Sequence, residues 1–188
     1  PAAQAGAQAV RAGIVNDDAL KLKEAIFQLA AKHDVVVVSG GSSAGMRDHT
    51  VEIFESLPHA QLLVHGVAIS PGKPFILATA TVNDRPVCLV GLPGHVTSAL
   101  ICARVFLTPL LEHLQGYAGS ATAPQVAAVL TRSVASAQGR RDYLRVRLRP
   151  LPCLPAGQPG TRPQTGIGLQ PLYEAEPIMG ASGLISGI

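Results

Sequence analysis

Apolar residues along the first two thirds of the chain follow two spacings, one typical of strands and one typical of helices. The unbroken valine run at residues 35–38 predicts a strand buried on both faces. In residues 20–30 the apolar positions recur three and four apart, which predicts a helix, with Asn16 or Asp17 placed to cap it. Because such strands and helices alternate over residues 9–114, we predict an α/β fold, a mostly parallel sheet with helices on both faces.

The same spacings place the other elements of this layer. We predict strands at residues 9–15, 34–41, 75–82 and 85–92, an extended segment at 60–69, and helices at 16–33, 48–57 and 97–114. A tight turn is expected at 71–74, where the sequence reads PGKP.

The pattern changes after Gly116, beyond which no helical spacing occurs. Residues 117–125 are typical of a linker, and residues 150–171 are dense in proline and glycine, which predicts a long loop. Between them lies a period-two pattern that predicts a half-buried antiparallel strand with a solvated arginine face. Its two faces are Leu144, Val146 and Leu148 against Arg145, Arg147 and Arg149. We therefore predict an α/β domain at residues 1–118 and a small all-β domain at 119–188.

Composition narrows the classes of protein. Hydrophobic residues make up 47% of the chain and charged residues 14%, which excludes a disordered chain. The net charge of +3 comes from scattered basic residues with few aromatic neighbours, so we expect no nucleic-acid partner. The longest apolar stretch, residues 98–111, contains Arg104 and is shorter than the ~20 residues of a membrane span, so we expect no membrane partner. Three cysteines without CxxC spacing are typical of reduced thiols and predict a cytoplasmic location.

Two loops rich in small residues are candidates for ligand binding. The segment SGGSSAGMRD, residues 39–48, follows a buried strand and leads into a helix. The segment GLPGHVTSAL, residues 91–100, joins a strand to a helix in the same way. Ligands bind outside the carboxyl ends of parallel strands, and helix starts offer free N–H groups to anions. Each loop therefore predicts either a cradle for a phosphate or pterin-like oxyanion or a plain strand-to-helix turn.

Charged residues near these loops have alternative interpretations. Asp48 is either a helix cap or an oxygen ligand for Mg²⁺, and the same holds for Asp17 and Asp18. Lys73, held between two prolines and a glycine, is either an oxyanion contact or an exposed turn residue. His95 is an acid, a base or a cap. The histidines have no zinc-type spacing, and the chain has no GxSxG nucleophile elbow.

Taken together, these motifs resemble a known family. DVVVVSGGSSAGMRD, HGVAISPGKPF and GLPGHVTSAL, with GIVNDDALKLKEAI before them and GRRDYLRVRL after them, are similar to the molybdopterin molybdenumtransferase family and its relatives, including the gephyrin E domain. The resemblance covers residues 9–149 and extends more faintly to 188. It implies a molybdopterin-binding α/β domain followed by a β-barrel-like domain. It also implies an enzyme that takes adenylylated molybdopterin and molybdate, cleaves the adenylate with Mg²⁺, and leaves molybdenum on the dithiolene.

The resemblance also implies roles for individual residues. Asp17 and Asp48 would bind Mg²⁺ or the reacting anion, and Lys73 would contact phosphate or molybdate. The residues that would bind the pterin are Ser39, Gly40, Gly41 and Ser43 on the first loop, with Pro93, Gly94 and Ser98 on the facing loop. The full-length protein would be a homodimer.

Two departures from the family bear on these expectations. Where the family reads PGNPVSA, this chain has His95 and Val96, so we expect altered loop geometry and oxyanion selectivity. Family members also have an earlier strand ending in a Thr-Gly-Asp type loop, and further domains. We therefore expect the 188 residues to be part of a longer protein and do not expect activity from this part alone. Two other functions stay open: a molybdopterin adenylyltransferase, which should lack PGKP and the β-rich unit, and a non-catalytic molybdopterin-binding scaffold.

Overall fold

The computed structural model describes residues 1–15, 18–40, 44–117, 125–151 and 172–178, with the backbone alone for residues 44–48. The chain divides into two compact units, Pro1–Ser120 and Ala121–Ile188, which are described separately.

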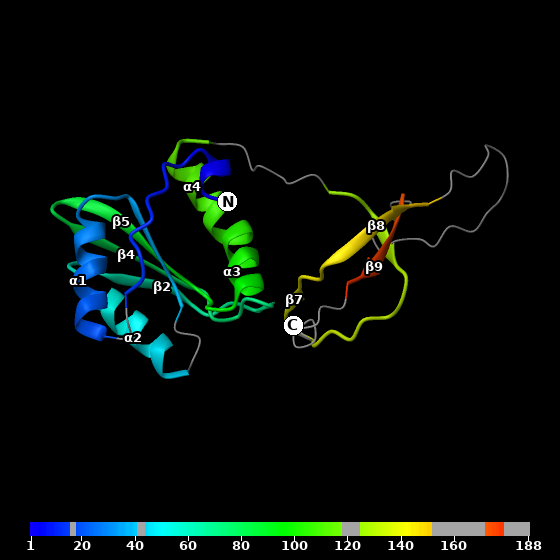
Figure 1. The fold of residues 1–188 in the computed structure, drawn as a ribbon, viewed down its shortest axis with the longest axis horizontal. Helices are drawn as coiled ribbons and strands as arrows, with labels where there is room; N and C mark the ends of the chain where they lie inside the picture. Colours follow the sequence, from blue (N-terminus) through cyan, green and yellow to red (C-terminus); the bar gives the residue numbers. More distant parts are fainter. Residues whose placement is uncertain (16–17, 41–43, 118–124, 152–171, 179–188) are drawn as a thin grey trace. The chain divides into compact units, whose positions relative to one another are not determined.

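The first unit contains a four-stranded sheet in the order β1-β5-β4-β2 (Figure 1). Its strands are β1 (Val35–Ser39), β2 (Gln61–His65), β4 (Ile76–Val82) and β5 (Arg85–Leu92). A two-residue strand, β3 (Ile69–Ser70), lies between β2 and β4 in the chain and is not part of this sheet. Its helices are η1 (Ala3–Ala5), α1 (Ala19–Ala30), α2 (Ala44–Glu55), and the successive segments α3 (Val96–Cys102), η2 (Ala103–Leu107) and α4 (Thr108–Leu114). The predicted α/β class is confirmed.

Strand direction in this sheet is mixed. β1 and β5 run parallel, whereas β4 is antiparallel to both β5 and β2. The reversal follows from the two-residue connection between β4 and β5, in which Asn83 and Asp84 have φ angles of 51° and 59°. Asparagine and aspartate tolerate this left-handed conformation, which tight hairpins require. Asn83 and Asp84 therefore form a tight hairpin turn, which makes β4 and β5 antiparallel.

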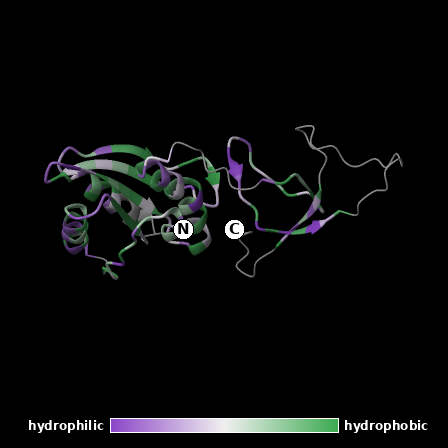
Figure 2. Cartoon of the chain, turned by 90° about the horizontal axis from the view of Figure 1, so that it is seen from above, coloured by the Kyte–Doolittle hydropathy of each residue, from purple (hydrophilic) through white to green (hydrophobic). Residues whose placement is uncertain are grey.

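The core of the first unit lies between the sheet and the pair α1 and α2. Ile26, Phe54 and Leu89 are almost completely buried there, together with alternate residues of β4. Residues of the helical run 96–114 are buried outside this cluster, Cys102 and Leu107 among them. Helices therefore cover both faces of the sheet, as predicted, and Figure 2 shows the hydrophobic residues concentrated in the strands and the helices facing them.

Three local predictions need correction. Residues 9–15 form no strand in the described structure, and Val10 and Ile14 are 64% and 89% exposed; an extended run becomes a strand only when another backbone pairs with it. Helix α2 begins at Ala44 instead of residue 48, so Asp48 lies inside the helix and does not cap it. Helix α1 is capped by Asp18 instead of Asn16 or Asp17; Asp18 accepts hydrogen bonds from the N–H groups of Leu20 and Lys21 at 3.0 and 3.2 Å, so the cap alternative given for Asp18 is confirmed.

Val96–Leu114 forms one helical run of 19 residues that includes the π-helical turn η2. By length and composition alone it could cross a membrane, a test that the core helices of soluble proteins also pass. It is longer than the apolar stretch estimated from the sequence. Cys102, Ala103 and Leu107 are buried along it, so one side of the run packs in the interior of the first unit.

The second unit is all-β in its described part. β6 (Ala128–Leu130), β9 (Tyr173–Pro177) and β8 (Val146–Pro150) form a sheet in that order, and β7 (Arg141–Asp142) is short. β8 is the strand expected from the alternation of arginine with leucine and valine. It pairs antiparallel with β9, and β6 pairs parallel with β9.

Cys102 and Cys88 are free thiols, with Cys102 buried and Cys88 half-buried. The Cys102 Sγ–H donates to the carbonyl oxygen of Gly72 at 3.3 Å. Burial raises the pKa of the Cys102 thiol to about 11 and also raises the pKa of Cys88. Cys102 is therefore a protonated structural thiol with low reactivity.

The stability of the protein should depend on pH through Cys102. Its thiol has a pKa of about 11 when folded, compared with an ordinary value of 9.0, so the folded state keeps a proton that the unfolded chain has lost. Keeping the Cys102 proton adds nothing to the pH dependence below pH 9, where both states are protonated. Above pH 9 the unfolded chain loses this proton first, so the free energy of unfolding falls as the pH rises toward 11. Urea denaturation of the wild type and of Cys102→Ser over this range should show the steeper decline in the wild type. Parallel pH curves would contradict the assignment.

Candidate functional site

A pocket of about 110 Å³ lies at one edge of the sheet in the first unit. Four segments line it: the end of β1 with the following loop, Thr50 of α2, the turn into the start of β4, and the loop from β5 into the start of α3. The lining residues are Val38, Gly40, Thr50, Pro74, Ile76, Gly91, Leu92, Pro93, Gly94, His95 and Ser98.

The sheet pairing explains why these segments meet. Ser39 at the end of β1 is in register with Leu92 at the end of β5, so the loops after these two parallel strands leave from the same edge. β4 runs in the opposite direction, and Ile76 at its start is in register with Gly91. The turn before β4 therefore reaches the edge from which the other two loops leave.

The glycine-rich loop contributes its described part to the pocket. Gly40 lines it with a φ of +132°, a conformation that residues with a Cβ rarely adopt, and an added Cβ there would meet no atom within 4 Å. Ser39 is exposed and is not among the lining residues, and Gly41 and Ser43 lie outside the described residues. Thr50 of α2 is 8% exposed and also lines the pocket.

The loop from β5 to α3 forms the facing wall. Pro93, Gly94, His95 and Ser98 all line the pocket, so three predicted pterin-binding residues of this loop meet Gly40 in one cavity. His95 is the N-cap residue of α3, and its side chain makes no capping bond. The first N–H groups of the helix lie beside the pocket and favour negative charge nearby.

Close packing around Gly72 and two backbone hydrogen bonds hold the PGKP turn in place. Gly72 is buried with a φ of +124°, and a Cβ built on it would lie 2.7 Å from Cδ1 of Ile69 and 2.8 Å from Sγ of Cys102. The N–H group of Val67 donates to the carbonyl oxygen of Lys73 at 2.9 Å. The N–H group of Gly66 donates to the carbonyl oxygen of Phe75 at 2.7 Å, so the backbone at the end of the turn is also fixed. Pro74 lines the pocket, whereas the Lys73 side chain is exposed and is not among the lining groups.

Aromatic packing ties the turn to the helical run. The rings of Phe75 and Phe106 stack with centroids 4.6 Å apart and planes at 29°, a contact worth roughly 1 kcal/mol beyond its buried area. With the Cys102 contact, two attachments join the PGKP turn to the helix that follows the facing wall. The PGKP turn and the helical run that begins at the loop from β5 to α3 are therefore in direct contact.

The electrostatic character of the pocket is simple. Of the lining residues His95 alone has an ionisable side chain, and none carries a carboxylate. Ser98 and Thr50 supply hydroxyl groups, and Val38, Ile76 and Leu92 supply apolar surface. This combination suits a flat, partly apolar ring with polar or anionic substituents.

Metal ligands are not evident in the part of the chain that the structure describes. No three histidine, cysteine or acidic side chains gather there closely enough to hold a metal ion. Asp17 lies outside the described residues, and of Asp48 only the backbone, within α2, is described. The metal-binding roles of these two residues stay predictions.

Some lining residues escape the sequence analysis. Thr50 and Ile76 face the pocket from α2 and β4, where only the tertiary fold brings them near the loops. Pro74 belongs to the PGKP motif, so the motif itself is the signal that could have included it.

Comparison with known sequences gives consistent relatives. The chain is 34% identical over 135 residues to a putative molybdopterin biosynthesis protein from Methanocaldococcus jannaschii, covering 72% of this chain and 30% of that protein. It is 32% identical over 133 residues to a molybdopterin molybdenumtransferase from Haemophilus influenzae, covering 71% and 31%. The chain therefore spans about a third of the length of these curated relatives.

Solved structures agree with this. A molybdopterin biosynthesis MoeA protein from Pyrococcus horikoshii superposes with a TM-score of 0.58 at 28% identity, covering 96% of this chain and 37% of that one. The resemblance predicted from the loop motifs is thus confirmed. Since the family described as "Probable molybdopterin binding domain" matches residues 2–113, more than half of the sequence, the chain belongs to that family.

Proposed function

We propose that this chain forms the pterin-binding part of a molybdopterin molybdenumtransferase, which inserts molybdate into adenylylated molybdopterin. The observation that carries the proposal is that Gly40, Pro74 and Gly94, one from each motif, line the same pocket. Relatives named as molybdopterin molybdenumtransferases support it. The PGKP turn and the β-rich second unit favour this enzyme over a molybdopterin adenylyltransferase.

In this proposal the pocket holds part of the pterin. Val38, Ile76 and Leu92 provide apolar contact to the ring, and the Ser98 and Thr50 hydroxyls exchange hydrogen bonds with its polar edge. Gly40 and Gly94 allow the ligand to approach the backbone closely, with Ser39, Gly41 and Ser43 completing the first loop.

In this proposal charged residues around the pocket bind the phosphate, the molybdate and Mg²⁺. Lys73, exposed on a rigid turn beside Pro74, contacts one of these oxyanions. Asp17 and Asp48 hold Mg²⁺, which when bound offsets the charge on the phosphate that is cleaved. Water attacks the phosphoanhydride bond between the phosphate of molybdopterin and AMP, and that bond breaks as AMP leaves. Two Mo–S bonds then form while the two dithiolene thiols give their protons to one oxo group of molybdate, which leaves as water.

The proposal extends to the whole protein. Residues 1–118 act as the molybdopterin-binding domain, and residues 119–188 belong to a β-barrel-like domain. The full-length protein is a cytoplasmic homodimer, as the family resemblance implies.

The first test is binding and turnover on the longest polypeptide that carries this sequence. Molybdopterin and its adenylylated form are titrated by fluorescence, with and without Mg²⁺ and molybdate, and AMP release is followed by chromatography. Mg²⁺-dependent AMP release on adding molybdate supports the transferase. Tight pterin binding without turnover would favour a scaffold, and formation of the adenylylated pterin from ATP would favour the adenylyltransferase.

Removing the positive charge of Lys73 should weaken ligand binding. A hydrogen bond to a charged group contributes about 1.5–3 kcal/mol, so Lys73→Ala should raise the Kd of adenylylated molybdopterin roughly tenfold to a hundredfold. Lys23→Ala removes an equal charge from an exposed position on α1 and serves as the control. Equal Kd values for Lys73→Ala and the wild type would exclude Lys73 from the site.

A further inference from the structure

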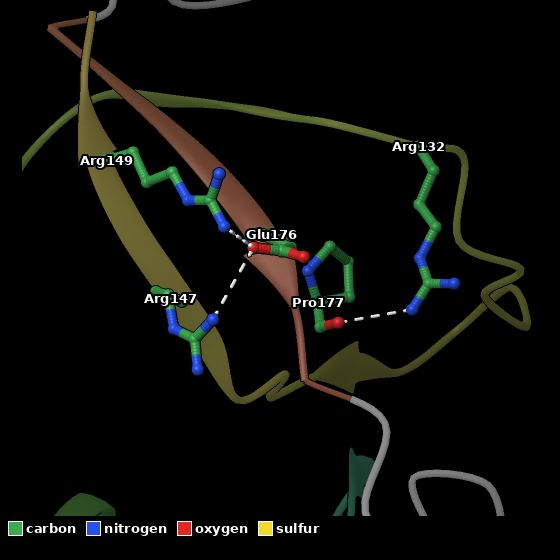
Figure 3. A network of polar contacts seen from close by, with 5 residues as sticks. All are labelled: Arg132, Arg147, Arg149, Glu176 and Pro177. Carbon is green, nitrogen blue, oxygen red and sulfur yellow. Dashed lines mark hydrogen bonds and ion pairs between the residues drawn. The ribbon is translucent and has the colours of Figure 1, made fainter.

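The second unit carries an arginine-rich strand, β8, at the edge of its three-stranded sheet. In β8, Arg147 and Arg149 lie on one face with Leu148 between them on the other. Figure 3 shows both arginines reaching from β8 toward Glu176 of β9. The nearest nitrogens of Arg147 and Arg149 lie 4.0 and 2.8 Å from the same oxygen, Oε2 of Glu176.

Oε2 of Glu176 is thus the shared partner of the Arg147 and Arg149 guanidinium groups. Most of their N–H groups do not face this oxygen and can donate to another partner. Their side chains are 65% and 60% exposed. Each guanidinium offers five N–H groups in a planar fork that matches a carboxylate. A neighbouring arginine, Arg132, donates to the carbonyl oxygen of Pro177 at 3.1 Å and fixes the end of β9 (Figure 3).

Charge across the described part of this unit is unbalanced. Residues 125–151 and 172–178 contain six arginines, no lysine and three acidic residues, a surplus of three positive charges. The arginines are Arg132, Arg140, Arg141, Arg145, Arg147 and Arg149, and the acids are Asp142, Glu174 and Glu176. A negatively charged partner is therefore favoured at this surface.

The structure also shows what kind of strand fits β8. Its partner β9 alternates acidic and apolar residues, and Arg147, Leu148 and Arg149 are in register with Glu176, Ala175 and Glu174. Within the described residues β8 pairs with β9 alone, so its other edge offers a row of backbone N–H and C=O groups. Leu148 is 45% exposed, which leaves apolar surface beside that edge.

We propose that the free edge of β8 binds an extended segment of a partner protein in which acidic and apolar residues alternate. The added strand takes up the backbone groups of the edge and repeats the pattern of β9. Acidic residues two apart lie beside Arg147 and Arg149, and the apolar residue between them lies beside Leu148. Cross-strand pairs of opposite charge and of apolar residues each stabilise such pairing.

The test uses a labelled peptide, Thr-Val-Glu-Val-Glu-Val-Thr, titrated with the longest polypeptide that carries this sequence and followed by fluorescence anisotropy. A scrambled peptide, Thr-Glu-Glu-Val-Val-Val-Thr, keeps composition and charge but loses the alternation. We expect the alternating peptide to bind at least tenfold more tightly than the scrambled one. Bound peptide should also slow hydrogen exchange of the β8 amides.

Variants separate the arginines from charge in general. Arg147→Gln with Arg149→Gln should weaken binding at least tenfold, whereas Arg11→Gln with Arg104→Gln, an equal loss of charge at exposed positions of the first unit, should leave it unchanged. Arg147→Lys with Arg149→Lys keeps the charge without the planar fork and should give intermediate affinity. This variant also keeps the test decisive if the double glutamine variant fails to fold.

Three results would overturn the proposal: no binding of the alternating peptide, equal binding of the scrambled peptide, or complete competition by inorganic polyphosphate without β8 protection. The last two would indicate a general anion surface. None depends on pterin binding, so failure here leaves the proposed function untouched.

Discussion

Replacing Gly72 by alanine should destabilise the first unit by about 2–6 kcal/mol, through two causes that add. A non-glycine residue at a φ of +124° costs roughly 1–3 kcal/mol in backbone strain. The new Cβ would also lie 2.7 Å from Ile69 and 2.8 Å from Cys102, and such overpacking typically costs about 1–3 kcal/mol. Urea denaturation should show this loss directly.

Gly116→Ala is the matched control for Gly72→Ala. Its φ of +78° also disfavours a Cβ, but no atom lies within 4 Å of the position. We expect a loss of about 1 kcal/mol there, from backbone strain alone. Losses of equal size in the two variants would show that packing beneath the PGKP turn contributes little. A Gly72→Ala variant that keeps its fold should also bind pterin less tightly, because Pro74 of the same turn lines the pocket.

Asp48→Asn should reduce Mg²⁺-dependent AMP release by a factor of about 100 to 1,000, the usual range for losing one group that stabilises developing charge. The substitution keeps the size of the side chain and removes its charge. Asp48 lies in the interior of α2, where asparagine and aspartate have similar helix propensity, so the free energy of unfolding should change by less than about 0.5 kcal/mol.

Glu55→Gln, an equivalent change at the exposed end of α2, provides the comparison for Asp48→Asn and should retain full activity. Raising the Mg²⁺ concentration should partly restore AMP release in Asp48→Asn if the carboxylate acts through the metal. Wild-type turnover in Asp48→Asn would remove Asp48 from the mechanism. A large loss of helix content instead would assign it a structural role.

Local patterns predicted those elements whose determinants are local. The valine run predicted β1, and the apolar spacing of residues 20–30 predicted α1, because burial leaves its period in the sequence. The expected burial of β1 on both faces was wrong, because Val36 is buried but Val37 is 43% exposed. The boundaries were harder. Ser43 is a residue type that favours a helix start, but it lies in a run of small residues with Gly45, a weak helix former, close behind it. The run was interpreted as a loop, so the beginning of α2 at Ala44 was missed.

Features that depend on distant parts of the chain were harder to predict. Residues 9–15 have the apolar character of a strand, but strand formation requires a pairing partner that their own sequence does not supply. In the candidate site, the three loop motifs were recognisable, whereas Thr50 and Ile76 reach the pocket only through the order and direction of the strands. The positions of Asp17 and Asp48 side chains stay predictions.

The reversed direction of β4 has a practical consequence for engineering. The two loops after β1 and β5 and the turn before β4 lie at one edge of the sheet, so the hairpin of Asn83 and Asp84 lies at the opposite end of β4 and β5. β5 contains eight residues, which separates this hairpin from the pocket by roughly 25 Å at about 3.3 Å per residue. Fluorescent labels, affinity tags or short inserted sequences placed in the hairpin would thus report on the protein while leaving its ligand-binding edge unaltered.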